Sequence, residues 1–400
     1  MVRAVNTMNK VRSWQGPAIL SYGFRPFFLL AGLWAALAMV LWIALLTGAI
    51  RLPTRFDLVT WHAHEFVFGY TSAVIAGFLL TAVPNWTGRL PVVGWPLAAL
   101  ALLWLAGRLA VACSAHLPPP WAAAIDLAHL AAMAIFLGRE IIAGRNWRNL
   151  PVLILLLLLI AANGVFHWQA YGDVAAGENV GLRLGIAVEV FLIALIGGRI
   201  IPSFTRNWLA ARKSTRLPAG WSNFDKVTLA LTAAALLSLV ALPQAMATAA
   251  LCLAAGITNL ARLLRWQGQQ TLSEPLLWSL HLAYAFLGLG FIALAAATLG
   301  LFDTAAALHI WLAGTVGLMT LAVMTRATRG HTGRQLTAPP STALIYALAV
   351  VAVAARVAAA LVADKLLFLY AASAAWIAAF VLFAAIYGPY LLTRTPKKTA

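Results

Sequence analysis

Apolar residues fill long runs along this chain, and short polar segments separate the runs. Runs of about 20 apolar residues have the length that a helix needs to cross a bilayer. The pattern therefore predicts about twelve transmembrane helices. Their approximate ranges are 26–48, 62–84, 93–113, 121–142, 150–169, 181–201, 226–242, 245–264, 275–298, 304–326, 342–361 and 366–391.

The composition supports this prediction. The chain has 400 residues, of which 63% are hydrophobic and 10% are charged. Soluble domains carry about 25% charged residues, so this chain has too little polar surface for a soluble globule. We expect an all-α, polytopic integral membrane helical bundle in which residues 1–400 form a single transmembrane domain. The lipid bilayer is then its first partner.

The formal charge of +17 indicates an orientation in the membrane. In a soluble protein such a charge would favour nucleic-acid binding, but here the cations sit in short bursts between apolar runs, so we expect no nucleic-acid partner. Cytoplasmic loops are rich in Lys and Arg, and alternate loops of this chain show that excess. We therefore expect both termini to be cytoplasmic. The predicted cytoplasmic cations are Arg3, Lys10, Arg12, Arg89, Arg139, Arg145, Arg148, Arg206, Arg212, Lys213, Arg216, Arg262, Arg265, Arg326, Arg329, Arg334, Arg394, Lys397 and Lys398, whereas the predicted outer segments hold Arg51, Arg55 and Lys365.

Two features bear on domain organisation and on cofactors. The predicted cytoplasmic loop 202–225 separates six spans from six, although no convincing repeat relates the two halves. Cys113 and Cys252 are far apart and form no Cys-x-x-Cys pair. Thiolate zinc sites, ferredoxin-type clusters and covalent c-type haem are therefore disfavoured.

The densest group of ionisable residues opens the second span, in the segment WHAHEFVFGY at 61–70. On a helix, His62 and Glu65 share a face, whereas His62 and His64 point about 200° apart. The two histidines could serve two centres, or one could bind a metal while the other carries protons. They could also be interfacial residues at the end of a span. Because ionisable groups inside a membrane are expensive, we favour a functional role, with Glu65 as the proton-transferring group.

Other histidines lie in or beside spans. His309 and His167 fall in the outer half by the predicted orientation, and His281 lies within the ninth span. Neutral imidazole is a natural ligand for haem iron and copper. For His167 an interfacial position is an equally good interpretation. His129 is the only histidine in its predicted span, and His116 is expected in a loop.

Two polar clusters lie at the predicted cytoplasmic ends of spans, around Arg199 and around Arg326. Both combine arginine with Ser, Thr or Asn donors, which suits anions or haem propionates. Ordinary positive-inside anchoring is the alternative. His331 follows Arg326 at this interface and could bind a metal or relay protons.

The longer motifs resemble the NnrS family of bacterial membrane proteins. The matching stretches are GFRPFFLLAG at 23–32, WHAHEFVFGY at 61–70, GFLLTAVPNWTGR at 77–89, GRIIPSFTRNW at 198–208, LHLAYAF at 280–286 and LHIWLAGTVGLMTLAVMTRATRGHTGR at 308–334. They run from the first span to the tenth, so the resemblance is close to full length. The match is looser after His309, where Ile310, Trp311 and Leu312 replace smaller residues.

The resemblance implies a twelve-span bacterial inner-membrane protein that contains non-covalent, b-type haem and copper. It also implies a link to nitric oxide metabolism and nitrosative stress, often beside denitrification. The family's histidine motifs fall on His62, His64, His281, His309 and His331, all of which we take as metal ligands. Its polar motifs fall on Glu65, Asn85, Arg199, Asn207 and Arg326, and we expect both arginines to contact a cofactor.

Three functions follow as hypotheses. The first is a haem and copper protein that binds or reduces nitric oxide, using an electron donor that the sequence does not identify. The alternative is a proton-coupled transporter of a metal or a nitrosylated compound, using the intramembrane His and Glu residues. The third is an assembly role for another respiratory complex.

Overall fold

The computed structural model describes residues 13–362 and 365–394, and this part of the chain is helical with no strand. Twelve of its helices are long and apolar enough to cross a membrane, which confirms the predicted number. Nine spans are single helices, namely α2 (Phe24–Leu46), α5 (Trp95–Ala112), α6 (Pro119–Ala143), α7 (Leu150–Tyr171), α10 (Asn223–Ala241), α11 (Met246–Leu264), α12 (Pro275–Thr298), α15 (Pro340–Ala358) and α16 (Lys365–Leu392).

The other three spans each contain a π-helical segment between two α-helices. The second span consists of α3 (Leu58–His64), the π-helix Glu65–Tyr70 and α4 (Thr71–Thr87); the sixth of α8 (Val180–Leu192), the π-helix Ile193–Gly197 and α9 (Gly198–Ala211); and the tenth of α13 (Thr304–His309), the π-helix Ile310–Gly317 and α14 (Leu318–His331). A π-helical segment is rare and is often found at a functional site. Two of the three directly follow a histidine, either His64 or His309.

The sixth and tenth spans are longer than the hydrophobic pattern predicts. The sixth was expected to end at residue 201, but α9 continues to Ala211. Ile201, Thr205 and Leu209 recur at helical spacing and are buried, and α9 packs against α12. This amphipathic extension is helical because protein covers its apolar face. A continuous run of apolar residues indicates a helix that lipid surrounds, so the hydrophobic pattern does not predict the extension.

The described residues divide into two compact units. Unit 1 comprises Met1–Gly185, Ala327–Arg334 and Phe380–Ala400, and unit 2 comprises Ile186–Arg326 and Gln335–Ala379. The boundary therefore lies inside α8 and not in the loop 202–225 that separates six spans from six.

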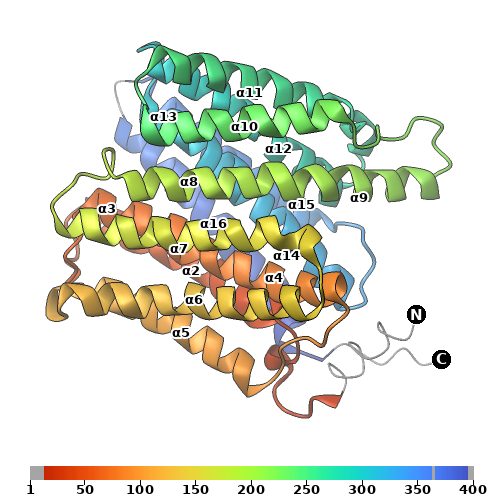
Figure 1. Cartoon of the computed structure of the whole chain (residues 1–400), viewed down its shortest axis with the longest axis horizontal. Coiled ribbons are helices and arrows are strands. Elements are labelled where there is room, and N and C mark those ends of the chain that lie inside the picture. The colour runs from red at the N-terminus through yellow and green to blue at the C-terminus, as the bar shows by residue number, and fades with distance from the viewer. Residues whose placement is uncertain (1–12, 363–364, 395–400) are drawn as a thin grey trace. The chain divides into compact units, whose positions relative to one another are not determined.

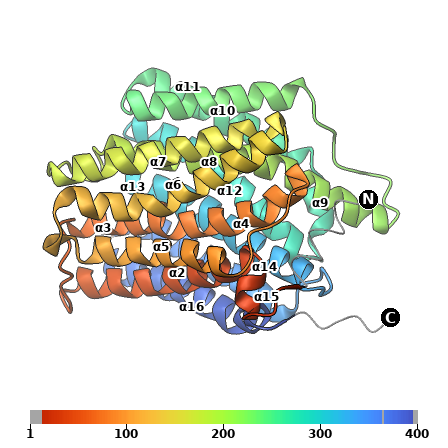
Figure 2. The same ribbon diagram turned by 60° about the horizontal axis from the view of Figure 1, so that its bottom comes forward.

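In unit 1, α4 packs against α2 and α6, and α6 also packs against α5 and α7. Figure 2 shows these neighbouring helices running alongside one another. In unit 2, α11 packs between α10 and α12, and these three helices lie together in Figure 1. Helix α12 also packs against α13 and the π-helix Ile310–Gly317.

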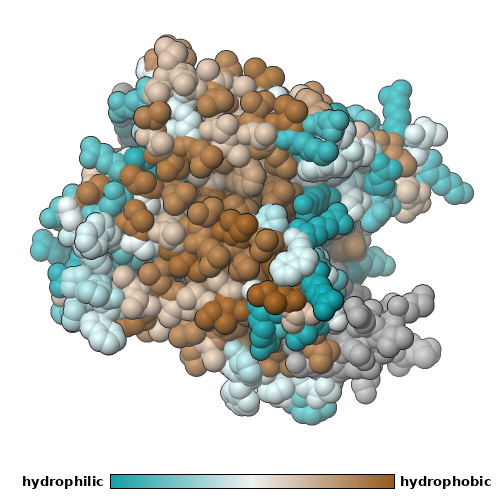
Figure 3. Space-filling view, viewed as in Figure 1, coloured by the Kyte–Doolittle hydropathy of each residue, from teal (hydrophilic) through white to brown (hydrophobic). Residues whose placement is uncertain are grey.

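The exposed side chains of unit 1 have the chemistry that lipid tails require. Figure 3 shows hydrophobic residues gathered over the middle of α6 and α7 and hydrophilic residues toward the helix ends. Leu102 and Leu109 of α5 and Ile135 of α6 are exposed large apolar side chains. Leucine and isoleucine side chains on an outward helix face are stable in hydrocarbon, so this surface supports a multi-pass membrane protein.

The predicted orientation remains a prediction. Arg3, Lys10, Arg12, Lys397 and Lys398, on which it partly depends, lie outside the described residues.

Candidate metal centre

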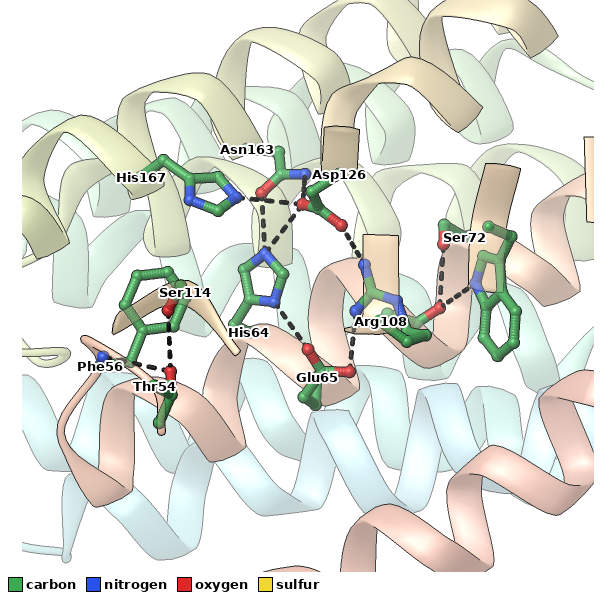
Figure 4. Close-up of polar contacts among 12 residues, drawn as sticks. Thr54, Phe56, His64, Glu65, Ser72, Arg108, Ser114, Asp126, Asn163 and His167 are labelled. Atoms are coloured by element: carbon green, nitrogen blue, oxygen red, sulfur yellow. Dashed lines mark hydrogen bonds and ion pairs between the residues drawn. The ribbon is translucent and has the colours of Figure 1, made fainter. Parts of the chain in front are cut away.

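A buried polar cluster in unit 1 joins four spans. Its members are His64 of α3, Glu65 of the π-helix, Arg108 of α5, Asp126 of α6, and Asn163 and His167 of α7. Figure 4 shows their side chains converging. Each of these residues is at most 4% exposed. Charged groups at such positions are expensive in a membrane protein unless they are paired, and here they pair with one another.

His64 is the centre of the cluster. Its Nδ1 lies 3.1 Å from Oε1 of Glu65, and its Nε2 lies 3.1 Å from both Oδ2 of Asp126 and Oδ1 of Asn163. Both ring nitrogens of His64 therefore face oxygen acceptors. A neutral imidazole has one N–H, so only one of its two ring nitrogens can donate to the oxygen that it faces. The other nitrogen needs a cation, either an added proton or a metal ion.

Arg108 links the two carboxylates. Its Nη1 donates to Oε2 of Glu65 at 2.8 Å, and its Nη2 donates to Oδ1 of Asp126. With neutral histidines, the two carboxylates and the one guanidinium leave a net charge of −1 in the cluster. A buried net charge is unfavourable, so this cluster is electrostatically suited to receive a cation.

His167 completes the donor set from α7. Its Nε2 lies 3.1 Å from Oδ2 of Asp126, and its Nδ1 lies 3.3 Å from the hydroxyl of Tyr171. Asn163 precedes His167 by four residues, hence by about one helical turn, and its amide donates to Oδ2 of Asp126 at 2.7 Å. Helix α7 thus brings both side chains to the same carboxylate.

His64, Asp126 and His167 could hold a metal ion together. One ligand atom from each residue lies within 4.8 Å of the others. Two imidazoles and one carboxylate are a usual donor set for a first-row transition metal. The remaining members act as outer groups, because Glu65 and Arg108 hold His64 and Asp126 in orientation, as partners of metal ligands commonly do.

The local helix structure explains how these side chains meet. Asp57 caps α3 by accepting from the backbone N–H groups of Val59 and Thr60, at 2.8 and 3.0 Å. The π-helix then begins at Glu65. Gly69 in this turn has no side chain, and an added Cβ would lie 2.3 Å from Nη1 of Arg108 and 2.7 Å from Oε2 of Glu65. Glycine at this position therefore makes the ion pair sterically feasible.

The structure places the other predicted residues of unit 1 at different positions. His62 packs on the rings of Trp42 and Phe66, at centroid distances of 4.3 and 4.8 Å, and Glu65 pairs with His64. His331 is exposed at the end of α14 and contacts the rings of Tyr22 and Phe24. His129 is buried, with its Nδ1 3.2 Å from the Leu100 carbonyl.

Unit 2 holds the remaining predicted residues. Nε2 of His281 lies 2.8 Å from the hydroxyl of Thr205, and its buried Nδ1 has no hydrogen-bond partner among the described residues. Nδ1 of the half-buried His309 lies 2.7 Å from the carbonyl of Ala305. Arg326 stacks over the ring of Phe204 at 4.3 Å, and Arg199 is exposed.

Three members of the cluster were missed by the sequence analysis, namely Arg108, Asp126 and Asn163. Arg108 is the single charged residue of the predicted span 93–113, and Asp126 lies inside the predicted span 121–142, three residues before His129. A charge inside a span is itself a signal of function. Asn163 is harder to recognise in the sequence, because the indication is only its spacing of four residues from His167.

The twelve spans and the buried donor set define a polytopic membrane protein with a candidate intramembrane metal centre. The family model described as "NnrS protein" matches residues 18–394, which is nearly the whole chain. The chain therefore belongs to the NnrS family, and this membership supports a membrane protein related to nitric oxide. No curated protein matches the chain significantly.

Proposed function

We propose that this protein binds copper at His64, Asp126 and His167 and acts in nitric oxide metabolism in the bacterial inner membrane. The observation that carries the proposal is the buried donor set, whose three ligand atoms lie within 4.8 Å of one another. Family membership supports the link to nitric oxide. A role in resistance to nitrosative stress, beside denitrification, belongs to the same proposal.

The donor set fits copper. Imidazole is a favoured ligand for copper, and copper binds more tightly than other divalent first-row metals at a given nitrogen and oxygen site. The net charge of −1 from Glu65, Asp126 and Arg108 is neutralised by a cuprous ion and becomes +1 with a cupric ion. Bound copper would supply a redox-active centre for a diatomic ligand.

The chain's own residues would prepare this centre. Glu65 and Arg108 orient His64 and Asp126 through the hydrogen bonds described above, so the ligands need little rearrangement. Oε1 of Glu65 lies 3.1 Å from Nδ1 of His64 and is positioned to hold the proton of that nitrogen. Nitric oxide is small and apolar, so it can reach a buried site through lipid. Its reduction would require electrons from a separate donor and protons, which Glu65 could supply as the carboxylate beside His64 that is not one of the three donors.

We also propose a non-covalent haem, which His309 would hold better than His281, the other candidate ligand in unit 2. Metal-bound histidines usually donate their other ring nitrogen to a carbonyl, and Nδ1 of His309 makes this contact with Ala305. His281 fits less well, because a Cβ at Gly268 would lie 2.7 Å from its Nδ1, so the backbone fills that side of the ring. Haem would supply an iron centre for nitric oxide. A Soret band that disappears in His309→Ala and survives in His64→Ala supports this ligand, and the reverse result overturns it.

The copper proposal is tested by metal analysis of the purified protein. We expect one copper per chain, lost in His64→Ala, His167→Ala and Asp126→Asn. His129→Ala is the matched control, because His129 lies on the same helix as Asp126 and is equally buried, but is not among the three donors. Full copper content in all three cluster variants would contradict the proposal.

The alternative function, proton-coupled transport of a metal or a nitrosylated compound, is favoured by one observation. The cluster is a continuous chain of ionisable groups, Glu65, His64, Asp126 and His167, within hydrogen-bond distance of one another. Such chains occur in proton relays of transporters. Substrate-dependent proton flux in proteoliposomes made from metal-free protein would support transport, and absence of flux would exclude it.

A further inference from the structure

The ring of Phe56 covers the two histidines of the candidate metal centre. Its centroid lies 5.5 Å from that of His64 and 5.4 Å from that of His167. It also contacts Phe166 and Tyr171, at 5.6 and 5.7 Å. Phe56 is only 5% exposed, although it belongs to the loop between α2 and α3 and not to a span. Phe56 is therefore an aromatic neighbour of the cluster that a loop, and not a span, contributes.

The loop that carries Phe56 is anchored on the end of α5. The backbone N–H of Arg55 donates to Oγ of Ser114 at 2.9 Å, and Nε of Arg55 donates to the Ser114 carbonyl at 3.0 Å. The hydroxyls of Thr54 and Ser114 lie 3.2 Å apart, as Figure 4 shows. On the other side of Phe56, Asp57 caps α3. The ring is thus held from both sides, which an incidental surface aromatic would not require.

Two further rings, Phe68 and Phe166, cover His64 from within the spans, at 5.5 and 5.2 Å. Together with Phe56 they pack aromatic carbon against His64. Exclusion of water strengthens the electrostatic interactions inside such a site. Of the three rings, only that of Phe56 belongs to a loop.

We propose that Phe56 is a specificity-determining plug, which closes the His64–Asp126–His167 cluster to water and hydrophilic solutes on the loop side and so restricts its ligands to small apolar molecules. Whether Phe56 closes the cluster to water can be tested on the protein without any ligand. The class of ligand rests on the proposed function, because a small apolar ligand is needed only if the cluster is a ligand-binding centre.

The test is the rate at which diethyl pyrocarbonate acylates each histidine of metal-free protein, measured by peptide mass spectrometry. In the wild type, His167 is 1% exposed and should react slowly, whereas the exposed His116 should react fast. In Phe56→Ala, the rate at His167 should rise at least about tenfold, because the site no longer needs to open before it reacts. Phe56→Leu, which keeps apolar bulk, should give a smaller rise.

The matched control is Phe66→Ala, since Phe66 lies in the same span as His64 and packs on His62. This variant should expose His62 and leave His167 protected. Buried His129 reports on folding, because its acylation would show that a variant had opened generally. If His167 stays protected in Phe56→Ala while His129 is also protected, the plug is excluded. If His129 reacts in Phe56→Ala, that variant has opened generally, and Phe56→Leu decides. In Phe56→Leu, an unchanged acylation rate at His167 together with a protected His129 overturns the proposal.

A second readout separates this inference from the proposed function. Copper-loaded Phe56→Ala should release copper to a disulfonated, membrane-impermeant chelator at least about tenfold faster than the wild type. If the wild type binds no copper, the proposed function fails, while the acylation rates still decide whether Phe56 closes the cluster.

Discussion

Arg108 is the residue whose charge holds the cluster together. It donates to both Glu65 and Asp126, and its side chain is 4% exposed. Truncation of one partner of a buried ion pair leaves an uncompensated charge, which destabilises a protein by about 3–5 kcal/mol. We expect Arg108→Met to lower the free energy of unfolding in detergent by about this amount, as measured by thermal or denaturant unfolding.

Arg139→Gln is the control for that measurement. Arg139 also pairs with a glutamate, Glu140, but its side chain is 68% exposed. Glu140 itself is buried, but it keeps its ion pair with Arg89 in this variant, so no buried charge is left uncompensated and the protein should unfold almost as the wild type does. Equal effects of the two substitutions would contradict the idea that Arg108 neutralises a buried cluster.

At this scale the sequence predicted part of the site. His64 and Glu65 stood out because three ionisable residues fall within four positions of a predicted span. Arg108 and Asp126 lie in two different spans, so only the packing of α5, α6 and the second span shows that they are partners. Local spacing also suggested that Glu65 would share a face with His62, whereas the structure pairs Glu65 with His64 and Arg108.

At the scale of elements, the π-helix Glu65–Tyr70 depends on a glycine. A Cβ on Gly69 would overlap both Arg108 and Glu65. Forced overpacking of this kind costs about 1–3 kcal/mol. We expect Gly69→Ala to lower the apparent Tm and to reduce copper content, both measured on the purified protein.

Gly138→Ala is the matched control within unit 1. Gly138 is also inside a span, but its added Cβ would meet nothing closer than 3.5 Å. Alanine is a better helix former than glycine by about 1 kcal/mol, so this variant should be as stable as the wild type or slightly more stable. A Tm lowered equally in both variants would show that Gly69 has no special role.

The elements themselves were largely predictable from hydrophobic run length, and the twelve spans were found within a few residues in most cases. The exceptions have a physical cause. Helix α9 and the end of α14 are polar on one face, so they lie outside the apolar runs although they are helical. The three π-helical segments lie within apolar runs, so the hydrophobic pattern does not distinguish them from the α-helices on either side.

At the scale of the whole molecule, the distribution of Lys and Arg predicts that both termini are cytoplasmic. Fusions at either end test this prediction. Green fluorescent protein should fluoresce at both termini, and alkaline phosphatase should be inactive there, because each folds on only one side of the membrane. An active phosphatase at either end would contradict the orientation.

The central claim is that two histidines from different spans, His64 and His167, bind one copper ion together with Asp126. Pulsed electron paramagnetic resonance of the cupric protein counts the coordinated imidazoles directly. We expect two imidazole nitrogens in the wild type and in His129→Ala, and loss of the copper signal in both His64→Ala and His167→Ala. A wild-type signal from a single imidazole, or one unchanged in both cluster variants, would contradict this claim.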